Sequence, residues 1–320
     1  MLSICRSELN REGIRAGGNS VDMKIEIISS NQKTTATFLP EWGGTVSSLM
    51  MPNMDDISQE RLYRHDFFNQ PPWAHFPGGA PFCFPICGRL ERGGKTGTYY
   101  YDGKTYQMNI HGFAWQLPWK VKKQESDSVT LVLESSDETL KQYPFHFRVE
   151  LKYQVKDGEF ICFQTYENTG EIPMPYAAGF HPYFLTPPAN AGKEKVTLHY
   201  QPTRRFVYNE KLTDLIGETA LFSLPTSIAN TEINEQLTML GENKNVELHF
   251  PSGEILSIEA QGREDPNLFS YLQLYTIPDR SFICVEPWMS FPNALNTVQG
   301  MRWLQPGKSE HGNFICKCMR

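Results

Sequence analysis

Two short segments of the chain place an ionisable side chain among stiff, apolar neighbours. Residues 179–184 read GFHPYF and hold His181 between aromatic residues and a proline, while residues 281–288 read SFICVEPW and carry Glu286 near the end of an apolar run. An unperturbed histidine has a pKa of about 6.5, and desolvation raises the pKa of a carboxyl group above its usual value of about 4.3. A carboxylate and an imidazole with opposite protonation states can act as a general base and a general acid. The alternatives are a core histidine bonded to a neighbour and a glutamate at a solvated strand end.

Two loop segments add a guanidinium and a second imidazole. Residues 78–89, GGAPFCFPICGR, form a glycine- and proline-rich loop that ends in Arg89. Such a loop can bring rigid backbone close to a small ligand, and a guanidinium offers several donors in a fixed geometry. Residues 109–114, NIHGFA, place His111 before a glycine at the end of an expected strand, where binding residues often lie. A packed loop with a solvated arginine and a structural histidine are the simpler alternatives.

The segment YLQLYT at residues 271–276 predicts a strand with one aromatic face. Because successive side chains of a strand point to opposite sides, Tyr271, Gln273 and Tyr275 share a face. Rings with one amide between them suit a sugar, whose C–H groups stack on aromatic faces while its hydroxyl groups require fixed polar partners. This strand therefore predicts a carbohydrate contact.

The same alternation orients the two ionisable residues. His181 and Tyr183 share one face, and Pro182, which cannot donate to a strand ladder, predicts an edge or a bulge at this point. Residues 281–288 are apolar on both faces, so the strand that carries Glu286 is expected to be central in its sheet.

The rest of the chain supplies many short strands to position these residues. Runs rich in valine, isoleucine, threonine, tyrosine and phenylalanine alternate with turn residues, which is typical of β structure. Asp102-Gly103 and Asp157-Gly158 predict tight hairpins, and residues 251–253 predict a third turn. Helical periodicity is scarce, and residues 226–237 are the best candidate for a short helix. The patterns predict an all-β fold, a large antiparallel β-sandwich.

The length and the cysteine content bear on domains and location. A chain of 320 residues is long enough for one large β domain, and we expect residues 23–320 to form a single domain. Residues 1–22 lack the apolar core of a secretory signal and are expected to be a disordered N-terminal extension. Seven cysteines, an odd number, do not indicate a disulfide framework. The cytoplasm is therefore the expected location.

Composition and spacing argue against several classes of partner. A net charge of −6 disfavours a nucleic-acid surface, and no run of 18 apolar residues indicates a membrane span. The cysteine pairs CFPIC and CKC lack zinc-site spacing, and the segment GRLERGGKT does not match a phosphate-binding loop. We therefore expect a small-molecule substrate, without a metal or a cofactor.

Taken together, these motifs resemble the aldose 1-epimerase (galactose mutarotase) family. The resemblance extends over roughly residues 24–318 and includes a closing turn, LQPGKS, near the end. It is carried, in order, by CGR with Arg89, NIHGFA with Asn109 and His111, AAGFHPYF with His181, LQLYT with Gln273, and CVEPW with Glu286. The resemblance implies a galactose mutarotase-like supersandwich with an open sugar cleft. It also implies cofactor-free interconversion of the α and β anomers of a free aldohexose such as glucose or galactose.

The resemblance assigns roles to the matching positions. Glu286 would be the base that removes the proton of the C1 hydroxyl, and His181 would be the acid that protonates the ring oxygen. Rotation about the C1–C2 bond and closure with reversed roles would give the other anomer. Four residues would bind the sugar: Arg89, His111, Gln273 and Asn109.

Other activities stay open at the level of sequence. GFHPYF stands where better-known members have HHSYFNL-like sequence, and the chain has no Asp-His pair, so the preferred hexose is not predicted. A hexose-6-phosphate mutarotase would need phosphate partners, for which Arg92, Lys95, Arg204 and Arg205 are candidates. A non-catalytic sugar-binding protein is disfavoured because binding alone requires neither an acid nor a base. A glycoside hydrolase would need a second placed carboxylate. A monomer or a homodimer is expected.

Overall fold

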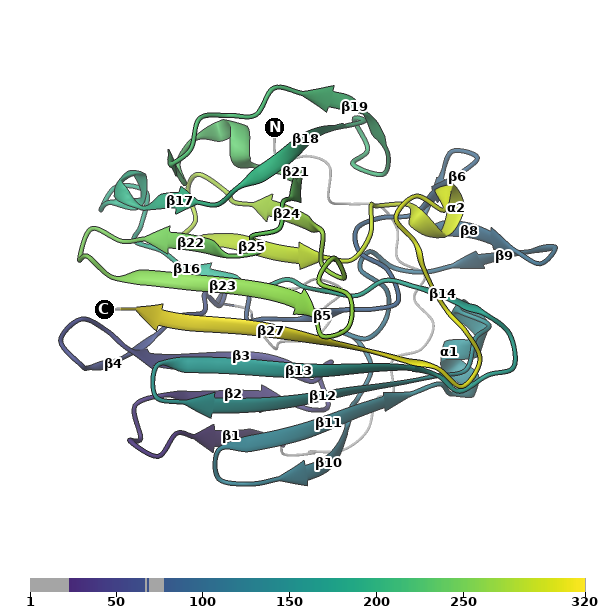
Figure 1. Ribbon diagram of the computed structural model, residues 1–320, viewed down its shortest axis with the longest axis horizontal. Coiled ribbons are helices and arrows are strands. Elements are labelled where there is room, and N and C mark those ends of the chain that lie inside the picture. The colour runs from purple at the N-terminus through teal and green to yellow at the C-terminus, as the bar shows by residue number, and fades with distance from the viewer. Residues whose placement is uncertain (1–22, 67, 69–77, 320) are drawn as a thin grey trace.

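The computed structural model describes residues 23–66, 68 and 78–319, and its largest element is a sheet of nine antiparallel strands (Figure 1). The predicted extension, residues 1–22, lies outside the described residues. The strands follow the order β10 (Lys120–Gln124), β11 (Ser128–Glu134), β12 (Phe147–Lys156), β13 (Glu159–Asn168), β27 (Ser309–Met319), β23 (Ile255–Gly262), β22 (Val246–His249), β17 (Thr197–His199) and β20 (Thr226–Ser227).

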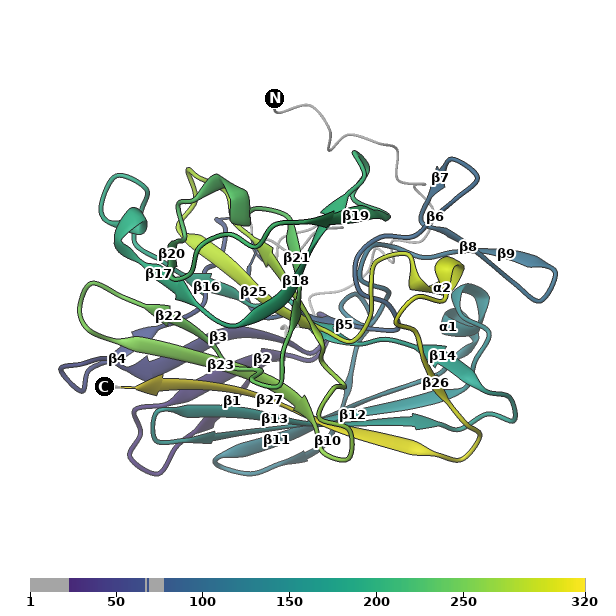
Figure 2. The same ribbon diagram turned by 45° about the horizontal axis from the view of Figure 1, so that its top comes forward.

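A second sheet of eight strands carries most of the predicted site residues. Its order is β19 (Leu215–Thr219), β18 (Pro202–Tyr208), β21 (Gln236–Leu240), β24 (Tyr271–Tyr275), β25 (Phe282–Trp288), β15 (Gly179–Phe180) and β5 (Phe82–Cys83), with β16 (Tyr183–Leu185) also paired to β25. In Figure 2, β18, β21 and β25 of this sheet lie above β10 to β13 and β27 of the nine-stranded sheet.

A four-stranded sheet and three small hairpins or strand pairs complete the β structure. The four-stranded sheet contains β1 (Ile25–Ile28), β2 (Thr35–Leu39), β3 (Thr45–Pro52) and β4 (Ser58–Glu60). The pairs are β6 (Glu91–Arg92) with β7 (Lys95–Thr96), β8 (Thr98–Tyr101) with β9 (Lys104–Gln107), and β14 (Met174–Tyr176) with β26 (Arg302–Leu304).

Alternating side chains build the core between these sheets. Every second residue of β12, from Phe147 to Val155, is buried, as the period of a strand requires. The ring of Phe180 in β15 stacks on that of Phe314 in β27, with centroids 4.6 Å apart, and Phe38 in β2 lies 4.8 Å from Tyr153 in β12. Both smaller sheets therefore pack on the nine-stranded sheet. The predicted all-β antiparallel fold is confirmed.

The three predicted turns are also confirmed. Asp102-Gly103 joins β8 to β9, Asp157-Gly158 joins β12 to β13, and residues 251–253 lie between β22 and β23. Asp102 has a positive φ of 45° and Gly103 one of 77°, the geometry that a tight hairpin demands and that glycine adopts without strain.

Helices are few and short in the described part of the chain. They are α1 (Asp137–Gln142), α2 (Ala294–Thr297) and the 3₁₀ turns η1 (Lys193–Lys195) and η2 (Thr231–Ile233). None of the described helices is long and apolar enough to cross a membrane. The predicted helix over residues 226–237 is wrong, because this segment contains β20, η2 and the start of β21. The side chain of Asn230 accepts a hydrogen bond from the N–H of Glu232, a local bond that competes with a continuous helix.

Candidate active site

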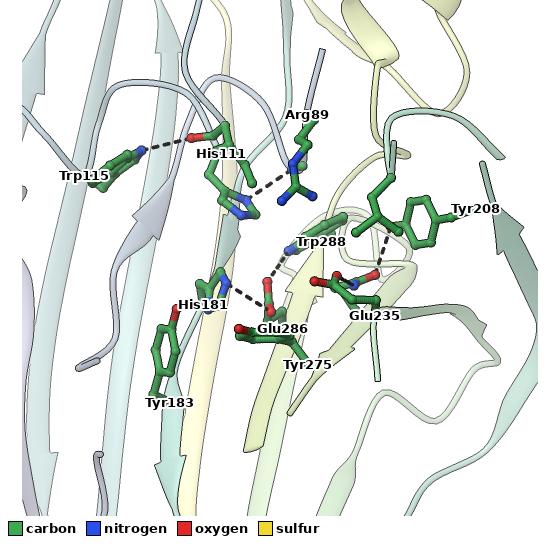
Figure 3. Close-up of a pocket in the computed structure, with 14 residues that line it drawn as sticks. Arg89, His111, Trp115, His181, Tyr183, Tyr208, Glu235, Tyr275, Glu286 and Trp288 are labelled. Carbon is green, nitrogen blue, oxygen red and sulfur yellow. Dashed lines mark hydrogen bonds and ion pairs between the residues drawn. The ribbon is translucent and has the colours of Figure 1, made fainter. Parts of the chain in front are cut away.

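A pocket of about 260 Å³ lies where the central strands β24 and β25 of the eight-stranded sheet meet the loops that carry Arg89, His111 and Glu235 (Figure 3). Its wall combines five aromatic side chains with two carboxyl groups, two imidazoles, a guanidinium and an amide. The lining residues are Gly88, Arg89, Ile110, His111, Trp115, His181, Tyr183, Tyr208, Leu212, Glu235, Gln273, Tyr275, Glu286 and Trp288. Each predicted site residue except Asn109 therefore lines this one pocket.

The strand register brings Gln273, Glu286 and His181 into one row. Gln273 of β24 pairs with Glu286 of β25. On the other side of β25, the register of β15 and β16 places His181, which lies between these two short strands, opposite Glu286. The strand is interrupted at Pro182, and both of its pieces, β15 and β16, pair with β25. β25 has partners on both sides, which confirms that it is central.

His181 and Glu286 contact one another inside the pocket (Figure 3). The Nε2 atom of His181 lies 3.3 Å from Oε1 of Glu286. Both side chains are buried, and Glu286 is only 1% exposed, which excludes a solvated strand end. Tyr183 stacks on the ring of His181 with centroids 4.8 Å apart. The two side chains therefore share a face of the strand, as predicted, and the stacking restricts the plane of the imidazole.

Burial favours the neutral form of both members of this pair. Burial lowers the pKa of His181 to about 3. Burial and, next, the negative charge of Glu235 raise the pKa of Glu286 well above its usual range, although a hydrogen bond from Trp288 opposes the rise. In this neutral form the pair holds one titratable proton, on the carboxyl group. Transfer of that proton across the 3.3 Å contact would convert the pair into an imidazolium and a carboxylate.

His111 is aimed at the pocket by strained backbone. It has a positive φ of 61°, which is uncommon for a residue with a Cβ and often marks a functional site. A Cβ on the following Gly112 would lie 2.0 Å from the carbonyl oxygen of Phe84, so glycine is required there. Half-buried Arg89 lies beside His111 in the wall (Figure 3).

The hydrogen bonding of His111 favours a donor over a metal ligand. One ligand atom from each of His111, His181 and Glu286 lies within 4.8 Å of the others, which is close enough to surround a cation. However, Nδ1 of His111 accepts the backbone N–H of Gly88 at 3.2 Å. The neutral ring then carries its proton on Nε2, and burial, followed by the charges of His181 and Arg89, lowers the pKa of His111 and keeps the ring neutral. Metal binding through Nε2 would break this arrangement, whereas donation to a sugar oxygen uses it.

Gln273 is held by neighbours that the sequence did not indicate. Its Nε2 donates to Oε2 of Glu235 at 3.2 Å, and its Oε1 accepts from the hydroxyl of Tyr208 at 2.9 Å. The amide thus links a carboxyl group to a phenol (Figure 3). Burial raises the pKa of Glu235, and its positive φ of 50° aims the side chain from the start of β21.

Sequence reasoning missed Glu235 and Tyr208 as site residues. Glu235 stands in a polar segment, and Tyr208 ends an ordinary strand. A positive φ at a glutamate cannot be read from one sequence, and no local pattern distinguished either residue. The pocket therefore contains a second carboxyl group that the sequence analysis did not expect.

Asn109 and the four candidate phosphate partners do not line the pocket. Asn109 is exposed, and its side-chain amide donates to Gln116 at 3.0 Å. Arg204 pairs with Glu218, and Arg205 donates to Gln236 at 2.8 Å. Arg92 lies over the ring of Tyr100, and Lys95 is exposed.

Comparison with known proteins identifies a family and several relatives. Residues 25–315 match the family model described as aldose 1-epimerase. The chain is 25% identical over 305 residues to protein LacX (chromosomal) of Lactococcus lactis subsp. lactis, with 86% of this chain and 89% of LacX covered. It is 26% identical over 198 residues to an Escherichia coli (strain K12) protein named "Putative glucose-6-phosphate 1-epimerase", with 56% and 62% covered.

Solved structures share the fold. A galactose mutarotase-like protein from Lactobacillus casei ATCC 334 superposes with a TM-score of 0.75 at 22% identity, covering 93% of this chain and 100% of that one. A galactose mutarotase related enzyme from Lactobacillus acidophilus superposes with a TM-score of 0.73 at 21% identity, covering 93% and 98%. At these identities the likeness concerns the fold.

Proposed function

The chain belongs to the aldose 1-epimerase family, whose members are isomerases, and we propose that it interconverts the α and β anomers of a free aldohexose such as glucose or galactose. The observation that carries the proposal is the contact between Nε2 of His181 and Oε1 of Glu286 at 3.3 Å within the pocket. The C1 hydroxyl and the ring oxygen of a pyranose are bonded to the same carbon. An acid and a base that are side by side can therefore address both oxygens at once.

The reaction begins with the single proton that the pair shares. Transfer of this proton to His181 leaves Glu286 as a carboxylate and His181 as an imidazolium. Glu286 then takes the proton of the C1 hydroxyl while His181 protonates the ring oxygen, and the bond between C1 and the ring oxygen breaks as the C1 carbonyl forms. The open-chain aldehyde is the product of this half of the reaction.

Ring closure reverses both transfers. After C1 has rotated about its bond to C2, His181 takes back the proton of the C5 hydroxyl as its oxygen attacks C1. Glu286 returns its proton to the carbonyl oxygen, and the other anomer results. Closure leaves Glu286 as a carboxylate and His181 as an imidazolium, and return of the proton from His181 to Glu286 across their 3.3 Å contact restores the starting pair. The cycle is balanced in protons and electrons.

The remaining wall residues support binding and charge stabilisation. Nε2–H of His111 and the guanidinium of Arg89 can donate to oxygens that gain negative charge. Glu235 can accept from a sugar hydroxyl while Gln273 holds it, which assigns Gln273 a supporting role beside any contact of its own. Five aromatic side chains in the wall suit the C–H faces of a pyranose.

The charge of the lining supports an unphosphorylated substrate. Among the lining residues, Arg89 is the one arginine or lysine, and two carboxyl groups, Glu235 and Glu286, oppose it. A sugar phosphate brings about two negative charges near neutral pH, and the single guanidinium of Arg89 does not supply the cluster of basic groups that would balance them. The name of the Escherichia coli relative favours the alternative, a glucose-6-phosphate 1-epimerase.

Polarimetry of freshly dissolved sugars tests the proposal. We expect the protein to accelerate the rotation change of α-D-glucose or α-D-galactose more than that of glucose 6-phosphate at equal concentration. Faster relaxation of the 6-phosphate would establish the alternative substrate. Saturable binding of a hexose without any acceleration would identify a sugar-binding protein. A cytoplasmic location and a monomeric or homodimeric state stay predictions.

A further inference from the structure

The indole of Trp288 is hydrogen-bonded to the Oε2 oxygen of the Glu286 carboxyl group. Trp288 and Glu286 lie two residues apart on β25 and share a face of the strand. Nε1–H of Trp288 donates to Oε2 of Glu286 at 3.2 Å, while Oε1 faces His181 at 3.3 Å. The two oxygens of one carboxyl group therefore have separate partners (Figure 3).

The surroundings of Trp288 prevent its indole from turning. A Cβ on Gly179 would lie 2.8 Å from Cδ1 of the indole, so the ring occupies space that any larger residue would fill. The ring of His111 meets the indole edge-on at an interplanar angle of 67°, with centroids 5.7 Å apart. The Trp288 side chain is 3% exposed, and close-packed interiors leave little room for another rotamer. The N–H direction is thus fixed.

We propose that Trp288 is a positioning residue, which fixes the rotation of the Glu286 carboxyl group so that Oε1 is the oxygen that exchanges protons with the sugar and with His181. The inference rests on the proposed function, in which Glu286 is the base. Without the indole N–H, the carboxyl group can rotate and both oxygens compete for the reactive position. The ionised form also loses a donor, which raises the pKa of Glu286 further.

The variant W288F tests this role because it keeps an aromatic ring and removes the donor, although it also replaces the two-ring indole with a smaller phenyl ring. We expect kcat to fall by about tenfold, the size for one lost hydrogen bond to a charged group, with little change in KM. The alkaline limb of the pH–rate profile should move to higher pH, because the pair of His181 and Glu286 then loses its shared proton at a higher pH. Incorporation of 3-benzothienylalanine at position 288 keeps the indole shape without the N–H and should reproduce both effects if phenylalanine disturbs folding.

W115F is the matched control. Trp115 lines the same pocket, but its Nε1 donates to the carbonyl oxygens of Ile110 and Gly112, at 3.1 and 3.0 Å. We expect this variant to leave the alkaline limb in place. An equal shift in W115F would mean that loosening of the pocket, and not the bond to Glu286, moves the limb, and the inference would be wrong.

An infrared titration separates this inference from the proposed function. The carboxyl band of Glu286, assigned by difference from E286Q, reports the pKa of Glu286 without any turnover. A higher pKa in W288F and an unchanged one in W115F would support the inference even in a protein that fails to anomerise any hexose. Identical titrations of wild type and W288F would overturn it.

Discussion

Two buried pairs of acidic and basic side chains lie in different parts of this molecule and differ in what they can do. His181 and Glu286 meet in the pocket at 3.3 Å. Arg61 and Glu254 form an ion pair on the wall of a separate cavity of about 450 Å³, and both are nearly as buried. The NH2 group of Arg61 also donates to the carbonyl oxygens of Met51 and Pro52, at 3.3 and 3.0 Å.

The difference between the pairs is the basic member. An arginine does not release its proton in a protein, so Arg61 cannot pass a proton to its partner, and its contacts connect β3 to Glu254, the residue before β23. An imidazole releases its proton readily, so the His181–Glu286 pair can move one proton between its members. Burial of an acidic and a basic side chain is therefore not enough for proton transfer. Both buried groups must also be able to gain and lose a proton.

The largest expected effect is the loss of turnover when the reactive pair is broken. E286Q and H181N should each lower kcat by about 10²–10⁴-fold, because each removes a general acid or base. Polarimetry measures the loss. E254Q is the matched control, since it removes the carboxylate of the other pair, and its folded fraction should turn over as wild type does. Full activity of E286Q would remove Glu286 from its role.

Breaking the second pair should act on stability instead. R61M leaves Glu254 buried without its guanidinium, and we expect the free energy of unfolding to fall by about 3 kcal/mol, the low end for a broken buried pair. Urea unfolding followed by fluorescence measures this change. The double variant R61M/E254L should recover much of the loss, because it leaves no uncompensated charge. An R61M variant as stable as wild type would contradict the view that this pair holds the sheets together.

The reactive pair should also carry a stability cost that depends on pH. Because the pKa of Glu286 is raised in the folded protein, the folded state favours the protonated form. The contribution of protonated Glu286 to the free energy of unfolding is therefore fully present at low pH. It is lost as pH rises from the ordinary glutamate pKa through the raised pKa of the folded protein. E286Q cannot titrate, so it should melt at a higher temperature than wild type at neutral pH, with the gap closing near pH 4. A constant gap across this range would contradict the raised pKa.

The smallest expected effect on turnover is at Asn109, which the resemblance to the family had assigned to sugar binding. N109A should change kcat/KM by at most about twofold, because Asn109 is exposed, bonds to Gln116 and lies outside the pocket lining. Initial rates by polarimetry measure this difference. A tenfold loss would show that the loop carrying Asn109 reaches the sugar during turnover.

Much of the fold could be predicted from local pattern. Alternating apolar residues and the turns at Asp102-Gly103 and Asp157-Gly158 identified the strands and hairpins, because side-chain period and turn conformation are local properties. The helix prediction over residues 226–237 was wrong because local side-chain hydrogen bonds, which the apolar pattern does not reveal, decided the backbone conformation. The polar residues of this segment fit a helix in pattern, but side-chain bonds such as that of Asn230 to Glu232 favour turns.

The sequence by itself determined which residues could carry protons: His181 and Glu286 stand out because each is ionisable in a setting that favours burial. Only the tertiary structure decided that they meet, since β15 and β16, far from β25 in the chain, pair with it and so place His181 opposite Glu286. The roles of Glu235 and of the Trp288 indole were likewise decided there. Proton affinity depends on burial and on neighbouring charges, and both are properties of the folded neighbourhood and not of any one segment.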